Sequence, residues 1–252
     1  MMGAVFAGKT VVVTGASRGI GVGIAAAFIE AGASVRLIAD DPAVFEVGFK
    51  LGAQAMVADI TKADEVTTAL QGLATIDILV NNAGLERLTP VDGPSPETEA
   101  MFRRIVDVNV VGTFIVTRAA LNHMRPGGRI INTASVWSRV VEPLFAGYVS
   151  SKHAVIGLTK TLAKELGPRG ITVNAVCPGW VKTESSLRSL KEMSRRSGRA
   201  EDDLLAEIVG HQALPGFMEP ADIAGPYLFL ASEWAANVTG QSLGVDRGEV
   251  PW

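Results

Sequence analysis

Short apolar runs alternate along the whole chain with longer stretches in which apolar positions recur at helical spacing. The short runs predict strands, and their hydrophobicity is continuous rather than alternating. Strands with this pattern are buried on both faces of a sheet. The predicted strands are Lys9–Thr14, Ser34–Ala39, Ala53–Ala58, Asp77–Val80, Arg129–Thr133, Ile171–Ala175 and Ser242–Val245.

Helical patterns separate most of these strands, and this alternation is typical of right-handed crossovers in a parallel sheet. No linker divides residues 1–252, so we predict a single doubly wound Rossmann-type α/β domain. The polar stretch at about 182–217 is interpreted as a substrate lid. Pro226 should kink the last helix, because proline removes a backbone hydrogen bond. The predicted helices are Gly19–Ala31, about Lys62–Leu73, Pro96–Met124, Tyr148–Leu166 and Asp222–Ala231.

Composition narrows the class of protein. The 252 residues are 48% hydrophobic and 19% charged, which excludes intrinsic disorder. A net charge of −3 argues against nucleic-acid binding. One cysteine, Cys177, and three scattered histidines offer neither a disulfide framework nor a metal site. The chain has no secretory signal and no apolar run of about 18 residues, so we expect a soluble, cytoplasmic protein without membrane association.

A glycine-rich turn follows the first predicted strand and opens the first predicted helix. Its sequence, TGASRGIG, starts at Thr14. Glycines let backbone N–H groups approach a diphosphate, and the positive end of the helix points at the same charge. A turn used only for packing is the alternative. The turn therefore predicts a nucleotide site formed by Gly15, Ser17, Arg18, Gly19, Ile20 and Gly21.

Two residues bear on which dinucleotide the chain binds. Asp40 follows the second predicted strand, where a carboxylate can accept the ribose hydroxyls of NAD and repel the extra phosphate of NADP. Arg18 acts in the opposite sense, because a guanidinium can pair with that phosphate. Asp40 lies nearer the expected ribose, so we favour NAD, with NADP as the alternative.

Tyr148 and Lys152 are four residues apart and share one face of a predicted helix. An ammonium near a phenol should lower the pKa of the tyrosine, which makes Tyr148 a candidate general acid and base. Ser135 directly follows the fifth predicted strand, at the sheet edge where such folds bind ligands. A purely structural tyrosine–lysine pair is the alternative.

These motifs together resemble the classical short-chain dehydrogenase/reductase family over about residues 7–248. The motifs are, in order, the TGASRGIG turn, Asp59-Ile60, Asn81-Asn82-Ala83-Gly84, Asn109, Ser135, Tyr148-x3-Lys152 and Pro178-Gly179. The resemblance implies a seven-stranded parallel sheet, a nicotinamide cofactor and an Asn–Ser–Tyr–Lys tetrad. It also implies a homotetramer, or a dimer, built on the helices near 96–124 and 148–166.

The resemblance also implies a role for each matching residue. Tyr148 exchanges a proton with the substrate oxygen, Ser135 holds that oxygen, and Lys152 lowers the tyrosine pKa and binds the nicotinamide ribose. Asn109 holds a water that connects Lys152 to solvent. Asp59 and Ile60 contact adenine, while the remaining cofactor contacts come from Asn82, Ala83, Gly84, Pro178, Gly179, Val181 and Thr183.

The substrate is less well defined. Trp137 and Trp180 are expected to form an apolar floor beside Ser135 and Tyr148, and polar contacts are available from Arg139, Glu142, Arg188 and Lys191. The family implies a small secondary alcohol or ketone. A β-ketoacyl thioester reductase using NADPH is an alternative, for which Arg129 and Arg169 occupy matching positions. A non-catalytic NAD sensor or scaffold, and a lyase or epimerase using NAD transiently, are the others.

Overall fold

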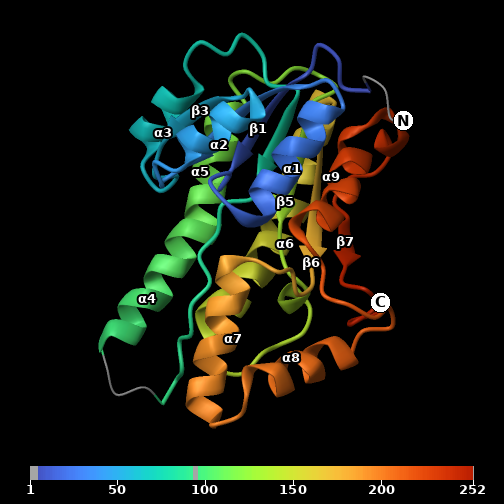
Figure 1. Cartoon of the computed structure of the whole chain (residues 1–252). Helices are drawn as coiled ribbons and strands as arrows, with labels where there is room; N and C mark the ends of the chain where they lie inside the picture. Colours follow the sequence, from blue (N-terminus) through green and yellow to red (C-terminus); the bar gives the residue numbers. More distant parts are fainter. Residues whose placement is uncertain (1–4, 93–95, 252) are drawn as a thin grey trace.

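The computed structural model describes residues 5–92 and 96–251, and it contains one all-parallel sheet of seven strands in the order β3-β2-β1-β4-β5-β6-β7. Helices cover both faces of this sheet (Figure 1). The seven-stranded, doubly wound fold expected from the sequence is confirmed. The strands are β1 Thr10–Thr14, β2 Ser34–Ala39, β3 Gln54–Val57, β4 Ile78–Asn81, β5 Arg129–Thr133, β6 Thr172–Pro178 and β7 Ser242–Val245.

The two faces of the sheet carry separate cores, because neighbouring strand residues point in opposite directions. Val11 and Val13 of β1 pack with the helices α1, α2 and α9. Val12, between them, packs on the other side with α3, α5 and α6. All three valines are fully buried, which explains why the run is continuously apolar. The helices are α1 Gly19–Glu30, α2 Val44–Leu51, α3 Ala63–Leu70, α4 Pro96–Val106, α5 Thr113–Ala120, α6 Ala146–Leu166, α7 Glu184–Ser197, α8 Glu201–Gly210 and α9 Ala224–Ala231.

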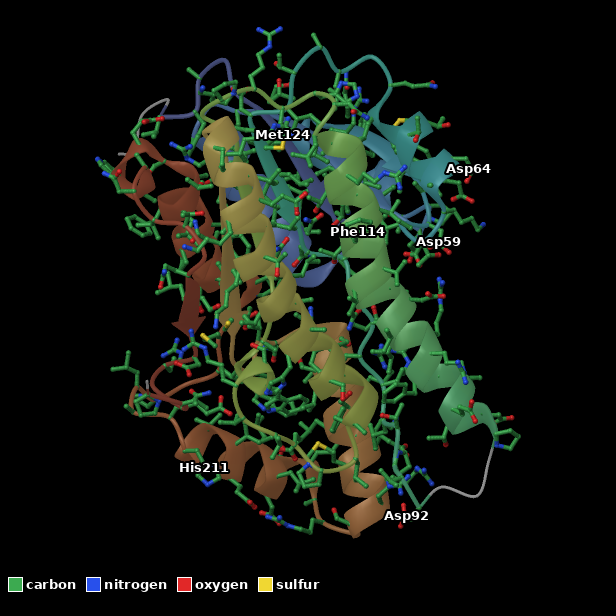
Figure 2. All side chains as sticks on the ribbon, turned by 180° about the vertical axis from the view of Figure 1, so that it is seen from behind. Asp59, Asp64, Asp92, Phe114, Met124 and His211 are labelled. Atoms are coloured by element: carbon green, nitrogen blue, oxygen red, sulfur yellow. The ribbon has the colours of Figure 1, made fainter. Side chains whose placement is uncertain are left out.

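The long helical pattern at 96–124 is interrupted in the structure. A π-helical segment, Asp107–Gly112, separates α4 from α5, and α5 ends at Ala120. Gly112 permits close packing there, since a Cβ would lie 2.7 Å from the Ile60 side chain. Figure 2 shows the green helix α5, with Phe114, beside the yellow helix α6. The helix expected over Pro96–Met124 is thus confirmed as far as Ala120, but the π-helical turn within it was not predicted, because periodicity does not separate α from π winding.

The expected kink at Pro226 is wrong. A 3₁₀ turn, Pro220–Ile223, precedes α9, which begins at Ala224. Pro226 therefore lies in the first turn of the α-helix, where a backbone N–H has no intrahelical acceptor. The missing donor costs the helix nothing at that position.

Two regions contain helices that the pattern did not predict. The segment after β2 forms α2, closed by Gly52 at φ +66°. Phe45 and Phe49 of α2 are exposed. The apolar residues of α2 therefore do not all lie on one buried face, and the sequence lacks the periodic pattern of a buried helix. The polar stretch after β6 forms α7 and α8, which lie beyond the ends of the strands (Figure 1). In the described parts of the chain, no helix is both long and apolar enough to cross a membrane.

Candidate active site

A cavity of about 420 Å³ lies at the carboxyl ends of the strands, between the sheet and α7. Most of the residues expected at the cofactor and catalytic sites line it, except Gly21 and Asn109. Of the polar residues expected near the substrate, Arg188 lines it, whereas Arg139, Glu142 and Lys191 do not. The lining residues expected from the sequence are Gly15, Ser17, Arg18, Gly19, Ile20, Asp40, Asp59, Ile60, Asn82, Ala83, Gly84, Ser135, Trp137, Tyr148, Lys152, Pro178, Gly179, Trp180, Val181 and Thr183.

The glycine turn is built by close backbone approach. Gly15 has φ +65°, and a Cβ on it would lie 2.6 Å from Ala83 Cα. A Cβ on Gly21 would lie 2.3 Å from the Gly15 carbonyl oxygen. Asn82 Nδ2 donates to the carbonyl oxygens of Thr14 and Gly15 at 3.1 and 3.2 Å. The turn is therefore a cradle that only glycine fits, at the N-terminus of α1, and it suits a dinucleotide diphosphate.

Three residues of the expected tetrad, Tyr148, Lys152 and Ser135, meet at the next part of the cavity wall. Tyr148 and Lys152 lie one turn apart on α6, and the Lys152 Nζ is 5.5 Å from the centre of the Tyr148 ring. The Ser135 side chain lies next to the Tyr148 phenol and acts to lower its pKa through hydrogen bonding. Ser135 Oγ also accepts from the Trp137 backbone N–H at 3.2 Å. A phenol, a hydroxyl and an amine thus converge at one point.

The electrostatics of this pair differ from the expectation. Burial raises the pKa of the Tyr148 phenol above its usual value, and the negative charge of Glu86 acts in the same direction. Burial lowers the pKa of Lys152 to about 8. Loss of solvation therefore dominates the pKa of Tyr148, and the structure does not show the lowering by Lys152 that the sequence suggested.

Asn109 lies in the π-helical segment, and its amide is fully engaged. Its Oδ1 accepts from the Leu85 N–H at 2.7 Å, and its Nδ2 donates to the Leu85 carbonyl at 3.0 Å and to Ser151 Oγ at 2.9 Å. A Cβ on Gly84 would lie 3.4 Å from Asn109 Oδ1 and 3.5 Å from Lys152 Nζ. The asparagine therefore ties the loop after β4 to α6, close to the lysine.

Comparison with known proteins places this geometry in a family. The family model described as enoyl-(acyl carrier protein) reductase matches residues 15–249. An uncharacterised oxidoreductase of Methylorubrum extorquens is 38% identical over 252 residues, covering 96% of this chain and 97% of the relative. The chain belongs to the short-chain dehydrogenase/reductase family. It is an NAD(P)-dependent oxidoreductase of that family.

Solved structures of short-chain dehydrogenases agree over nearly the whole chain. One is described as a putative NAD(P)-dependent gluconate 5-dehydrogenase of Beutenbergia cavernae with bound NADP at low occupancy. It is 34% identical to this chain with a TM-score of 0.87, and the match covers 98% of each chain. Another is a 3-oxoacyl-[acyl-carrier protein] reductase of Brucella melitensis with bound NAD, with a TM-score of 0.83 and 32% identity over 98% of this chain and 93% of that one. Structural neighbours of this short-chain dehydrogenase thus bind either dinucleotide.

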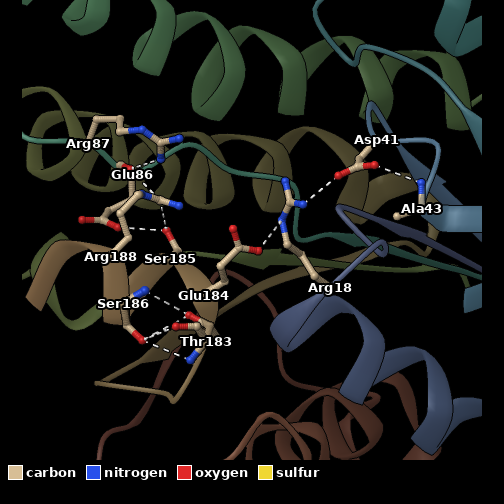
Figure 3. Close-up of polar contacts among 10 residues, drawn as sticks. All are labelled: Arg18, Asp41, Ala43, Glu86, Arg87, Thr183, Glu184, Ser185, Ser186 and Arg188. Carbon is tan, nitrogen blue, oxygen red and sulfur yellow. Dashed lines mark hydrogen bonds and ion pairs between the residues drawn. The ribbon is translucent and has the colours of Figure 1, made fainter. Parts of the chain in front are cut away.

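In this chain, Arg18 is paired with an acid. Arg18 Nη1 lies 2.7 Å from Asp41 Oδ2, and its Nε lies 3.8 Å from Glu184 (Figure 3). A backbone hydrogen bond from Ala43 and the bond from Arg18 lower the pKa of the Asp41 carboxyl. Asp40, one residue earlier, is exposed at the cavity edge. From the sequence, Arg18 favours NADP and Asp40 favours NAD. The sequence does not reveal that Arg18 forms an ion pair with Asp41.

Asp59 is held by a partner that the sequence did not suggest. Its Oδ1 accepts from the Thr61 N–H and hydroxyl, and its Oδ2 lies 3.0 Å from Arg104 Nη2 on α4. Both Asp59 and Arg104 line the cavity. The contact of Asp59 and Ile60 with adenine stays a prediction.

Aromatic side chains form the apolar part of the wall, as expected. The Trp137 ring contacts Tyr148 and Trp180 edge-on, with centroids 5.9 and 6.0 Å apart. Phe145 packs against Trp137 at 4.9 Å. The position of Trp137 beside the phenol restricts the space for a substrate next to the tetrad.

A polar cluster on the opposite wall was not singled out as a unit. The Glu86 carboxylate accepts from Ser185 Oγ at 2.9 Å (Figure 3). It also accepts from Ser189 Oγ at 2.5 Å, and the two bonds join the loop after β4 to α7. Arg87 and Arg188 line the same part of the cavity. Arg188 was noted only as one of several polar residues, because nothing in the spacing of Glu86 and α7 predicts that they meet.

The two arginines that motivated the thioester alternative lie at the other end of the sheet. Arg129 begins β5, whereas the cavity is at the end of that strand; it is 5% exposed and donates to the Gly127 carbonyl at 2.8 Å. Arg169 precedes β6 and donates to the Leu121 carbonyl. Neither is part of the cavity, so the site geometry adds nothing to that alternative.

Proposed function

We propose that this enzyme transfers a hydride between NAD and a small secondary alcohol or ketone, with Tyr148 as the proton donor and acceptor. The observation that carries the proposal is the convergence of Tyr148, Ser135 and Lys152 in the cavity that also contains the glycine turn. A phenol that faced solvent would support no such chemistry.

Each residue of this convergence has a physical task. A substrate oxygen that binds between the hydroxyls of Ser135 and Tyr148 is held by the first and exchanges a proton with the second. Lys152 Nζ donates to the Thr133 carbonyl at 2.7 Å, which leaves two of its N–H donors for ribose hydroxyls and for a developing phenolate. The nicotinamide ring, when bound, supplies or accepts the hydride.

Asn109 acts on this site through the loop and helix that it joins. Its side-chain bonds to Leu85 and Ser151 fix the distance between the loop after β4 and α6. Its carbonyl oxygen accepts from Thr113 Oγ1 at 2.8 Å. We therefore assign Asn109 a positioning role, and the water implied by the family resemblance stays a prediction.

The preference for NAD rests on charge near the adenine ribose. Asp40 places a carboxylate at the end of β2, where it can accept ribose hydroxyls. Arg18, the cation that would attract the additional phosphate of NADP, is already paired with Asp41. Both features disfavour NADP.

The segment at 182–217 is proposed as the substrate lid. Thr183 caps α7 by accepting from the Ser186 N–H, and the Ser186 hydroxyl bonds back to the Thr183 N–H. Serines and Arg188 of α7 reach the cavity. A lid so placed closes over the substrate end of the site.

The assembly is proposed to be a homotetramer, or a dimer, formed through α4, α5 and α6. Phe102, Val111 and Phe114 are exposed on α4, the π-helical segment and α5. Apolar side chains gathered on adjoining helices mark subunit contacts. Sedimentation of Phe114→Glu should give a smaller species than the parent chain, and an unchanged mass would contradict the assignment.

The function is tested by initial rates with NAD and NADP across secondary alcohols, polyols, hydroxy acids and β-hydroxyacyl thioesters. We expect turnover with NAD and a kcat/KM at least about tenfold below it with NADP, the ratio that about 1.4 kcal/mol of differential binding gives. Tight NAD binding without turnover of any compound would favour a sensor or scaffold instead.

A further inference from the structure

We propose that Arg87 and Arg188 form an anion-binding site, so that the substrate is a small hydroxy or oxo compound carrying a carboxylate or phosphate group. The proposal deepens the proposed function, since it assumes that the cavity holds the reacting alcohol. It rests on the way two guanidinium groups from separate elements meet at one cavity wall.

The two arginines converge on a neutral oxygen. Arg87 Nη1 donates to the Glu86 carbonyl oxygen at 2.7 Å, and Arg188 Nη2 approaches the same oxygen at 3.4 Å (Figure 3). Arg188 also donates to Ser185 Oγ at 2.7 Å. Burial lowers the pKa of Arg87, and repulsion from the like charge of Arg188 acts in the same direction, against the attraction of Glu86. The pair is thus arranged for a shared anionic ligand.

The Glu86 and Glu184 carboxylates attract the Arg87 guanidinium electrostatically, but each bonds to other partners. Both oxygens of Glu86 accept hydrogen bonds from serines of α7, and burial raises the pKa of that carboxyl. Glu184 is 71% exposed and lies near Arg18. Within residues 5–92 and 96–251, neither Arg87 nor Arg188 forms an ion pair with a carboxylate. Each guanidinium has five N–H donors, so most remain for a ligand.

The two arginines line the same cavity as the reacting groups. Arg87 follows Gly84–Leu85 in the loop that Asn109 fixes, and Arg188 lies on α7 above it. The two arginines lie beside Glu86, and the negative charge of Glu86 raises the pKa of the Tyr148 phenol. An anion held by the pair would therefore direct a hydroxyl or carbonyl group of a short substrate toward Ser135 and Tyr148.

The test is equilibrium binding of butyrate to the enzyme saturated with NADH, measured by calorimetry beside butyramide, its neutral counterpart. We expect butyrate to bind at least about tenfold more tightly than butyramide. Arg87→Gln and Arg188→Gln should each remove that difference, and Arg188→Lys should keep part of it. Arg195→Gln, which changes a lid arginine paired with Glu192, is the matched control and should have no effect.

Methyl phosphate, titrated in the same way, distinguishes the two anion classes; tighter binding than butyrate assigns the site to phosphate esters, and weaker binding assigns it to carboxylates. Equal affinity for butyrate and butyramide would overturn the proposal. Weaker NADH binding in both glutamine variants would also overturn it, by assigning the arginines to the cofactor. Turnover of neutral alcohols without any anion preference would leave the proposed function intact while this inference fails.

Discussion

Lys152 Nζ donates a 2.7 Å hydrogen bond to the carbonyl oxygen of Thr133, the last residue of β5. The bond anchors a buried ammonium at the sheet edge, with the Tyr148 ring 5.5 Å away. Keeping a cation there is costly, because burial lowers the pKa of Lys152 from 10.5 to about 8. The position therefore favours function over stability.

The first prediction concerns this cost. Lys152→Met should abolish turnover and stabilise the fold by about 2 kcal/mol at pH 7, which is several degrees in Tm for a chain of this size. The native ammonium is protonated in both folded and unfolded chains below about pH 8, so the stabilisation by the variant is full there. It should shrink as pH rises from about 8 toward 10.5, where the unfolded chain also loses its proton. Melting curves at pH 7 and pH 10 that show no difference would contradict this.

The second prediction concerns cofactor choice. Asp41→Asn releases Arg18 from its 2.7 Å ion pair, and Asp40→Ala removes the carboxylate at the end of β2. Both changes should raise the ratio of kcat/KM with NADP to that with NAD, by about tenfold for the double variant. Asp64→Asn, an exposed change on α3, is the control. An unaltered ratio in the double variant would show that neither acid affects binding of the 2′-phosphate.

The third prediction concerns the glycine cradle. Gly21→Ala places a methyl group 2.3 Å from the Gly15 carbonyl, so the turn must move. We expect lower stability and NADH binding weaker by at least about tenfold. Gly210→Ala, at a helical glycine with nothing within 4 Å of the new Cβ, should be neutral or slightly stabilising. Fluorescence titration with NADH and thermal melts of both variants decide the matter; equal behaviour would refute the assigned close approach.

The sequence predicts the sheet and the pairing of Tyr148 with Lys152 because both rest on local rules, whereas the tetrad as a whole comes from the family resemblance. The valines of β1 are apolar on both faces, and the spacing of Tyr148 and Lys152 puts them on one side of a helix whatever surrounds it. The cavity gathers nearly all the residues expected there. Asn109 and Gly21 are exceptions. They support residues that line the cavity without lining it themselves, and the spacing of residues along the chain does not reveal this.

Other features depend on contacts between distant segments. The ion pair of Arg18 with Asp41 and the joining of Glu86 to α7 each need two elements to be placed in space first. The pKa of Tyr148 depends on burial, which opposes the effect inferred from Lys152 alone. Helical periodicity likewise does not distinguish the π-helical winding at 107–112 from a regular helix.

The central claim is tested most directly by comparing the two tyrosines of the chain. Tyr227 is also buried, and its hydroxyl bonds at 2.7 Å to Oγ1 of Thr133, whose carbonyl accepts from Lys152, but Tyr227 itself does not line the cavity. Tyr148→Phe should bind NADH with unchanged affinity while kcat falls by at least about 10³-fold, the contribution expected of an acid–base group. Tyr227→Phe should keep kcat within a few-fold of the parent enzyme. A Tyr148→Phe enzyme that turns over substrate as fast as Tyr227→Phe would contradict the account.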